Sequence, residues 1–247
     1  MSQASPPLFC QAFSLPKRGN SAEEYEDAAA ADPRRGRFAI ADGAAESSFA
    51  ALWAQLLVTG FATAESTDLT PWLNWLPALQ QRWDATVSGR ALPWFAEMKL
   101  QQGAFATFLG VIVEPARWRA VAVGDSCLFQ IRRGRLHRAF PLTSADGFGT
   151  TPWLVGSRTS CGAALEDRSQ RAEGDWQTGD RLWLMTDALA LWFLEEVERC
   201  RGPWQELEGL LRAATPRDAF VEWVGKQRDA CRLRNDDVTL MVINHSR

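Results

Sequence analysis

The stretch Arg37-Phe38-Ala39-Ile40-Ala41-Asp42-Gly43-Ala44-Ala45-Glu46-Ser47-Ser48 carries the strongest local signal for the fold. Residues 37–41 form a short apolar run after the turn sequence DPRRG at 32–36, which predicts a buried strand. The run stops at Asp42-Gly43, which places a carboxylate at the end of a rigid element, beside backbone that another group can approach closely. Such a position suits a metal or phosphate site. Asp-Gly is also a common turn dipeptide, so a plain turn is the alternative.

The segment that follows, residues 49–99, has helical spacing. Ser47 and Ser48 are candidate N-caps for a helix over residues 49–61. Further on, large apolar side chains recur at intervals of three and four residues, at Trp72, Trp75, Leu76, Leu79 and Trp83. We expect this stripe to be a core face, with a partner-binding groove in the tryptophan-rich segment 72–94 as the alternative. Prolines are expected to limit or start the helices, at Pro71, Pro77 and Pro93.

The composition is that of an ordinary globular chain of 247 residues, 46% hydrophobic and 23% charged. We expect a single domain over residues 1–247, because no linker-like segment divides it. The net charge of −3 gives no electrostatic footprint for nucleic acid or for a membrane surface, so neither partner is expected. No apolar run approaches the roughly 20 residues of a membrane span, and the first residues lack the pattern of a secretory signal.

Cysteine and histidine usage argues against a zinc site. The five cysteines are scattered and form no CxxC pair, at Cys10, Cys127, Cys161, Cys200 and Cys231. Such thiols suit a reducing compartment, so we expect a cytoplasmic protein. The two histidines lie away from the aspartate-bearing segments, at His137 and His245. The chain also lacks the G-x-S-x-G elbow, the P-loop and the G-x-G-x-x-G fingerprint.

Residues 21–31 have two competing interpretations. Ser21 with Glu24 three residues later is a capping box, and the alanines at 28–31 would extend a helix. A hairpin through Asp32-Pro33 to the strand at 37–41 is the other interpretation. Local propensity does not decide between them.

From Phe105 onward the pattern changes to β-strands. Residues 105–113 and 118–123, a strand at 128–131 and another starting at Leu136 predict an antiparallel meander. Residues 141–176, rich in Gly, Ser, Thr and Pro, are expected to be a long connection with a functional role. An apolar strand at 181–187, helices from Ala188 to about residue 230 and a last strand at 238–243 complete an α+β layered fold.

Acidic residues stand repeatedly at the edges of these apolar strands, at Asp42, Asp125, Asp187, Asp236 and Asp237. Each of them alone is explained by a turn or a cap. Carboxylates brought together by converging strand ends repel one another, and a bound cation relieves that repulsion. Oxygen ligands of this kind suit hard divalent cations such as Mg²⁺ or Mn²⁺.

The order of these motifs resembles the metal-dependent serine/threonine phosphatases of the PPM (type 2C) family, from about residue 13 to residue 243. The matching residues are Glu26-Asp27, Asp42-Gly43, Gly124-Asp125-Ser126, Thr186-Asp187 and Asp236-Asp237-Val238-Thr239. The resemblance implies a four-layer α-β-β-α sandwich with two central antiparallel sheets and a site for two metal ions at one end. It also favours a strand at 24–31.

The resemblance implies a role for each matching residue. Asp42 would bridge both metal ions, the carbonyl of Gly43 would bind the second ion, and Asp187 and Asp236 would hold the first. Glu26 and Asp27 would orient bound waters from behind the metal ligands, with Asp237 beside them. Asp125 matches an aspartate that is tied to a third metal ion in some members, and Arg18 stands for the arginine that grips the substrate phosphate.

Several positions depart from the family pattern. Ala44-Ala45-Glu46 stand where two glycines, sometimes with a histidine, usually follow Asp42-Gly43. The Ser-Asp-Gly motif has become Thr186-Asp187-Ala188, and the closing Asp-Asn pair has become Asp236-Asp237. Leu191 replaces the aspartate expected four positions beyond Asp187, which puts the third metal ion in doubt.

Three functional hypotheses follow. The first is a phosphatase that uses two Mg²⁺ or Mn²⁺ ions to hydrolyse phosphoserine and phosphothreonine on a protein substrate, with small phosphorylated metabolites as an open possibility. The second is a catalytically weak relative that serves as a binding or regulatory module, suggested by the altered positions 44, 45 and 188. The third is an unrelated α+β protein whose aspartates are turn residues.

Overall fold

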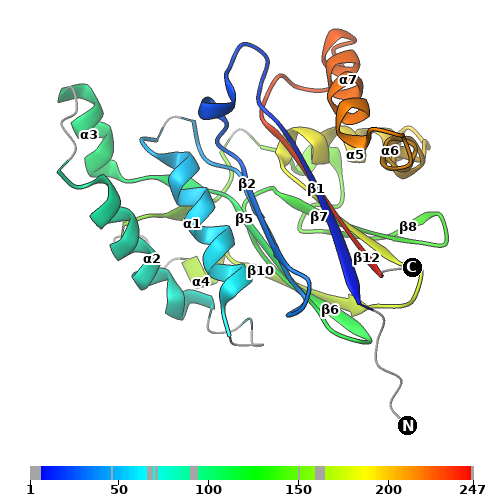
Figure 1. Cartoon of the computed structure of the whole chain (residues 1–247), viewed down its shortest axis with the longest axis horizontal. Coiled ribbons are helices and arrows are strands. Elements are labelled where there is room, and N and C mark those ends of the chain that lie inside the picture. Colours follow the sequence, from blue (N-terminus) through cyan, green and yellow to red (C-terminus); the bar gives the residue numbers. More distant parts are fainter. Residues whose placement is uncertain are drawn as a thin grey trace.

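Two five-stranded antiparallel sheets pack face to face in the described part of the chain, and helices cover their outer faces (Figure 1). The computed structural model describes residues 7–45, 47–65, 69, 72–89, 94–149, 151–158 and 165–245, without the side chains of residues 72, 73 and 94–96. The first sheet has the order β1-β12-β11-β7-β8 and the second β10-β6-β5-β3-β2. The predicted four-layer α-β-β-α sandwich is confirmed.

The elements have the following bounds. The strands are β1 Leu8–Leu15, β2 Ala28–Asp32, β3 Arg37–Ala41, β4 Phe105–Ala106, β5 Phe108–Val113, β6 Arg117–Val123, β7 Cys127–Arg132, β8 Arg135–Phe140, β9 Val155–Gly156, β10 Gln170–Asp175, β11 Arg181–Met185 and β12 Val238–His245. The helices are α1 Ala50–Thr63, α2 Trp72–Val87, α3 Trp94–Gln102, α4 Leu165–Arg168, α5 Asp187–Glu198, α6 Pro203–Leu211 and α7 Pro216–Asp229.

Both faces of each sheet are buried, and this explains the continuous apolar run at 37–41. In β3, Phe38 and Ile40 point into the core between the sheets, whereas Ala39 and Ala41 face the helical layer of α1 and α2. A third cluster fills the space between the first sheet and α5–α7, and Trp192 is buried there. The apolar stripe of α2 is a core face where its side chains are described, because Leu76 and Trp83 are buried.

The predicted meander is divided between the two sheets. β5 and β6 pair in the second sheet, whereas β7 and β8 pair in the first. The chain therefore crosses from one sheet to the other at residues 124–126, where Gly124 has a positive φ of 98°. A Cβ at Gly124 would lie 2.8 Å from the Thr107 side chain, so this crossing needs a glycine.

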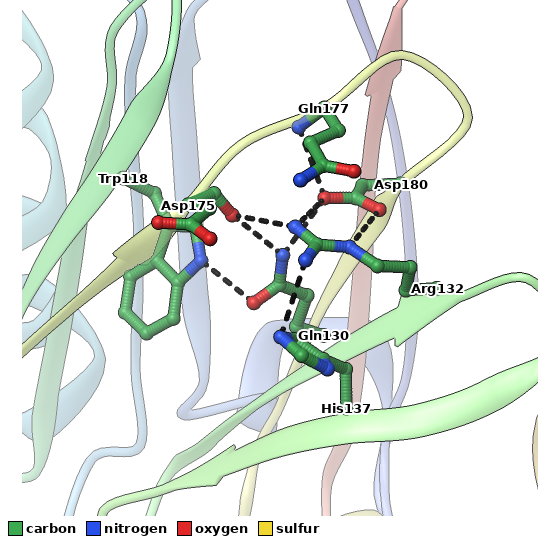
Figure 2. A network of polar contacts seen from close by, with 7 residues as sticks. All are labelled: Trp118, Gln130, Arg132, His137, Asp175, Gln177 and Asp180. Carbon is green, nitrogen blue, oxygen red and sulfur yellow. Dashed lines mark hydrogen bonds and ion pairs between the residues drawn. The ribbon is translucent and has the colours of Figure 1, made fainter.

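A buried polar network ties the two sheets together at the ends of the strands remote from residue 125 (Figure 2). The Trp118 indole of β6 donates to Gln130 Oε1 of β7 at 2.9 Å, and Gln130 Nε2 donates to Asp180 Oδ2 at 2.8 Å. Arg132 donates to both carboxylate oxygens of Asp180, at 2.8 and 2.7 Å. The network provides hydrogen-bond partners for the buried Gln130 amide and for the buried Asp180 carboxylate.

Two expectations for the helical segment are corrected. Phe49, in a left-handed conformation, precedes α1, and Ser47 does not cap the helix, because its hydroxyl donates to Ala44 O at 2.8 Å. Pro77 lies inside α2 and does not limit it, whereas Pro71 and Pro93 lie outside the described residues.

The strand expected at 24–31 begins later, at Ala28, because the capping box closes a single 3-10 turn at Ala22–Glu24. The long connection over 141–176 also contains regular structure, since β10 pairs with β6 at the edge of the second sheet.

No helix in the described part of the chain is long and apolar enough to cross a membrane. The four cysteines in the described ranges are free thiols, at Cys10, Cys127, Cys200 and Cys231.

Candidate metal centre

Strand ends from both sheets meet at one end of the sandwich and bring the predicted acidic residues together. Asp42 follows β3, and Asp125 lies in the crossing between β6 and β7. Asp187 follows β11 as the first residue of α5, and Asp236 directly precedes the Asp237 that leads into β12. Because β11 pairs antiparallel with both β7 and β12, the end of β11 lies beside the starts of those two strands. The sequence segments are far apart, but the topology places them at one edge.

Asp27 is held by two neighbouring strands of the first sheet, β11 and β12. Its Oδ2 accepts hydrogen bonds from the hydroxyls of Thr186 at 2.9 Å and Thr239 at 2.7 Å. The Thr239 backbone N–H in turn donates to Thr186 Oγ1 at 2.9 Å. A threonine at the end of β11 and one near the start of β12 therefore fix this buried carboxylate. Thr107, between β4 and β5, holds the backbone of Asp42, because its hydroxyl accepts from Asp42 N at 3.1 Å.

Asp237 joins the beginning and the end of the chain. Its Oδ1 accepts the backbone N–H of Lys17 and its Oδ2 that of Glu26, each at 2.7 Å. Two acceptor oxygens are needed for these two donors, which explains why an aspartate stands where the family pattern has an asparagine. Arg228 of α7 closes the same junction by donating to Pro16 O at 3.0 Å and to Asp236 O at 2.5 Å.

Gly43 packs directly against the segment that carries Glu26. The Gly43 N–H donates to Glu26 O at 3.2 Å. A Cβ at position 43 would lie 2.7 Å from that same carbonyl oxygen and 3.0 Å from Ala50. The glycine is therefore required by close approach of backbone, and not by a positive φ.

The acidic residues repel one another electrostatically. Burial raises the pKa of Asp42 well above its usual value, and the charges of Asp27, Asp187, Asp125 and Asp236 raise it further. Burial likewise raises the pKa of Asp187, and so do the charges of Asp125 and Asp236. A group of carboxylates whose charges raise the pKa values of Asp42 and Asp187 is a site that a cation stabilises.

The chemistry of the donors fits a hard divalent cation. Asp27 Oδ1 and Asp125 Oδ1 are buried and have no hydrogen-bond partner, although buried carboxylate oxygens are normally paired. Carboxylate and backbone carbonyl oxygens are the ligands that Mg²⁺ and Mn²⁺ prefer. The side-chain positions are not those of a closed coordination shell, because no group of three His, Cys, Asp or Glu residues in the described ranges is arranged to hold an ion.

Arg18 lies at the edge of this region. Its guanidinium forms an ion pair with Asp229 at 2.8 Å and contacts Gly225 O at 3.4 Å, both on α7. Its backbone N–H donates to Asn235 Oδ1 at 2.7 Å. The arginine thus sits between α7 and the loop that carries Asp236.

Two of the altered family positions, 188 and 191, are buried at the start of α5. Ala188 is buried in the first turn of α5, and its backbone N–H donates to Asp187 Oδ1 at 2.6 Å. The Ala44 N–H donates to Phe105 O at 2.9 Å. Leu191 is buried on the helix that begins at Asp187.

Sequence reasoning did not assign roles to Thr107 or Arg228. A hydroxyl side chain next to an apolar strand was the available signal for Thr107, because serine and threonine side chains often form hydrogen bonds with nearby backbone. No local pattern indicates Arg228, since its contacts depend on how α7 packs.

Comparison with known proteins gives a structural likeness only. No protein-family model matches the chain, and no curated protein sequence matches it. Among solved structures, the catalytic domain of the serine/threonine protein phosphatase PstP in complex with two manganese ions superposes with a TM-score of 0.59 at 20% identity, over 96% of this chain and 98% of that one.

Two further solved structures of phosphatases are similar to this chain in fold. The PPM Ser-Thr phosphatase MsPP from Mycobacterium smegmatis, in complex with cacodylate, has a TM-score of 0.59 at 19% identity, over 98% of this chain and 100% of that one. The serine/threonine phosphatase Stp1 from Staphylococcus aureus has a TM-score of 0.64 at 13% identity, over 100% and 98%. The chain therefore has the fold of the PPM-type serine/threonine phosphatases.

Proposed function

We propose that this protein is a metal-dependent phosphatase that hydrolyses phosphoserine and phosphothreonine on proteins, and that residues 1–247 act as one catalytic domain. The observation that carries the proposal is the cluster of mutually repelling carboxylates at one end of the sandwich. Similarity to phosphatase structures over nearly the whole chain supports it. The four cysteines within the described residues are free thiols, which supports a reducing compartment such as the cytoplasm as its place of action.

Asp42, Asp187 and Asp236 are proposed to hold two Mg²⁺ or Mn²⁺ ions, with the carbonyl of Gly43 as a further ligand. Divalent cations in such a site lower the pKa of a water molecule and neutralise charge on a phosphoryl group. Asp125 is the candidate for a third ion, although Leu191 stands where a second carboxylate for that ion is expected.

The chain's own residues hold the Glu26-Asp27 pair in place behind these ligands. Thr186 and Thr239 both donate hydrogen bonds to Asp27 Oδ2 and so fix the orientation of the carboxylate. The other oxygen, Oδ1, has no hydrogen-bond partner. Asp237 holds the backbone of Glu26 and so sets the position of the Glu26-Asp27 pair relative to β12. Pre-arranged carboxylates of this kind reduce the reorganisation needed during reaction.

The experiment that tests the proposal is hydrolysis of p-nitrophenyl phosphate and of a phosphothreonine peptide with Mn²⁺, with Mg²⁺ and with EDTA. Turnover that requires the metal ion and falls by a factor of about 100 or more in Asp187→Asn is expected, since removal of one metal-ligating charge weakens the whole site. A folded wild-type protein without turnover in either metal ion contradicts the proposal. Turnover that persists in Asp187→Asn contradicts the assignment of the site.

A further inference from the structure

Arg234 lies in the loop between α7 and β12, two residues before Asp236, and its neighbours on both sides are anchored. Leu233 is buried in the core formed with α5–α7. Asn235 forms two hydrogen bonds with the backbone of Arg18, from Arg18 N to Oδ1 at 2.7 Å and from Nδ2 to Arg18 O at 3.2 Å. The backbone of Arg234 is therefore fixed, and its side chain projects from a defined point.

The guanidinium of Arg234 is available to a ligand. The side chain is exposed and forms no ion pair or hydrogen bond with the residues that the structure describes. It lines a hollow of about 390 Å³ together with Ala188 and Leu191 from the start of α5. Ala188 directly follows Asp187, so this hollow adjoins the candidate metal centre. Glu195 also lines the hollow, but its carboxylate forms an ion pair with Arg199 at 3.2 Å, so Arg234 can receive an anion from solution.

Arg18, by contrast, is occupied by protein groups. Its guanidinium is paired with Asp229 and contacts Gly225 O, and both partners belong to α7. The contribution of Arg18 to the site comes from its backbone, which holds Asn235 from both its N–H and its carbonyl. Position 18 thus fixes the loop from which Arg234 projects.

We infer that Arg234, and not Arg18, binds the phosphate group of the substrate, a phosphate monoester dianion. The inference rests on the proposed phosphatase function. A planar guanidinium can donate two parallel hydrogen bonds to phosphate oxygens, a geometry that a lysine cannot reproduce. The phosphate would lie between Arg234 and the carboxylate cluster, on the side of the cluster that faces the start of α5.

The test compares Arg234→Ala, Arg234→Lys, Arg18→Ala and the control Arg232→Ala. Arg232 is exposed, lines the same hollow and has the same charge. In hydrolysis of p-nitrophenyl phosphate with Mn²⁺ we expect Arg234→Ala to raise KM by a factor of about 10 or more, because a charge-assisted bidentate contact is lost. Arg234→Lys should recover part of this loss, and Arg232→Ala should change KM by less than a factor of about 2.

Calorimetric binding of inorganic phosphate with Mn²⁺ gives a second readout that does not depend on turnover. Arg234→Ala should weaken phosphate binding by a factor similar to its effect on KM. Equal losses in Arg232→Ala and Arg234→Ala, or a loss in Arg18→Ala alone, contradict the inference, as does a wild-type protein that does not bind phosphate. If wild type has no turnover but binds phosphate through Arg234, the proposed function fails and the binding site stands.

Discussion

Single residues at the candidate centre are constrained by contacts that sequence patterns do not show. Gly43 is the clearest case, because the carbonyl of Glu26 occupies the space that a side chain would need. The hydrogen bond from Gly43 N to the same carbonyl keeps the two segments together. The family pattern placed a metal-ligating carbonyl at this residue, and the packing gives an independent reason for a glycine here.

We therefore predict that Gly43→Ala lowers the free energy of unfolding by about 1–3 kcal/mol, as expected when backbone must shift to admit a methyl group. It should also weaken Mn²⁺ binding, since the shift moves Asp42 and Glu26 apart. Denaturant unfolding and metal titration measure the two effects.

The matched control is Gly209→Ala. Gly209 lies inside α6, and a Cβ there has no neighbour within 4 Å. This substitution should raise the free energy of unfolding by about 0.5–1 kcal/mol, because alanine is the better helix former. An equal loss of stability in both variants would show that close approach is not the reason for Gly43.

At the scale of elements, the sandwich is fastened at both ends by polar groups, and the end remote from the acidic cluster depends on Asp180. Burial opposes ionisation of this carboxyl, but hydrogen bonds from Arg132, the Gln177 N–H and Gln130 outweigh burial and lower its pKa (Figure 2). A carboxyl with a lowered pKa stabilises the fold above the pKa of the unfolded chain and loses that contribution as pH falls through its folded value.

We predict that Asp180→Asn lowers the free energy of unfolding at pH 7 by about 3 kcal/mol, because Arg132 loses its buried counter-charge. The wild type should lose stability between about pH 5 and pH 3, and the variant should lose less over that interval. Chemical denaturation at a series of pH values measures both.

Asp84→Asn is the control for this experiment. Asp84 pairs with Arg158 at 3.2 Å on the surface, where both side chains are exposed. Its removal should change the free energy of unfolding by no more than about 0.5 kcal/mol. A similar loss in both variants would refute a special role for the buried pair.

The elements themselves were largely predictable from the sequence. Strands buried on both faces, such as β3 and β11, appear as short apolar runs, and α2 appears as a stripe at helical intervals. Errors arose where tertiary contacts decide. The capping box at Ser21 closes one turn only, because the alanines that follow pair with β3. The division of the meander between sheets depends on the crossing at residues 124–126, which strand periodicity cannot show.

At the scale of the whole molecule, the candidate centre is assembled from both ends of the chain. Asp237 accepts the backbone N–H groups of Lys17 and Glu26, more than 200 residues away in sequence, as the separations of 220 and 211 residues show. The motif order indicated which carboxylates belong together. The motif order could not indicate the contact of Asp237 with Lys17 and Glu26. In the sequence, the Asp236-Asp237 pair is visible only as a departure from the Asp-Asn pair of the family.

We predict that Asp237→Asn, which restores the family pattern, destabilises this protein. Asparagine has one acceptor oxygen, so one of the two backbone N–H groups would face the side-chain NH2 group and lose its hydrogen bond. This loss should cost about 1–3 kcal/mol. Thermal unfolding with EDTA measures the change without a contribution from bound metal. A variant at least as stable as wild type would contradict the role assigned to the carboxylate.

The most direct test of the central claim is calorimetric titration of Mn²⁺ into wild type, Asp42→Asn and the exposed-surface control Asp167→Asn. The charges of the other carboxylates all act on Asp42, so its neutralisation should weaken Mn²⁺ binding by a factor of about 10 or more. Wild type and Asp167→Asn should bind Mn²⁺ alike. Failure of wild type to bind Mn²⁺, or equal binding by Asp42→Asn, would contradict a metal centre at this end of the sandwich.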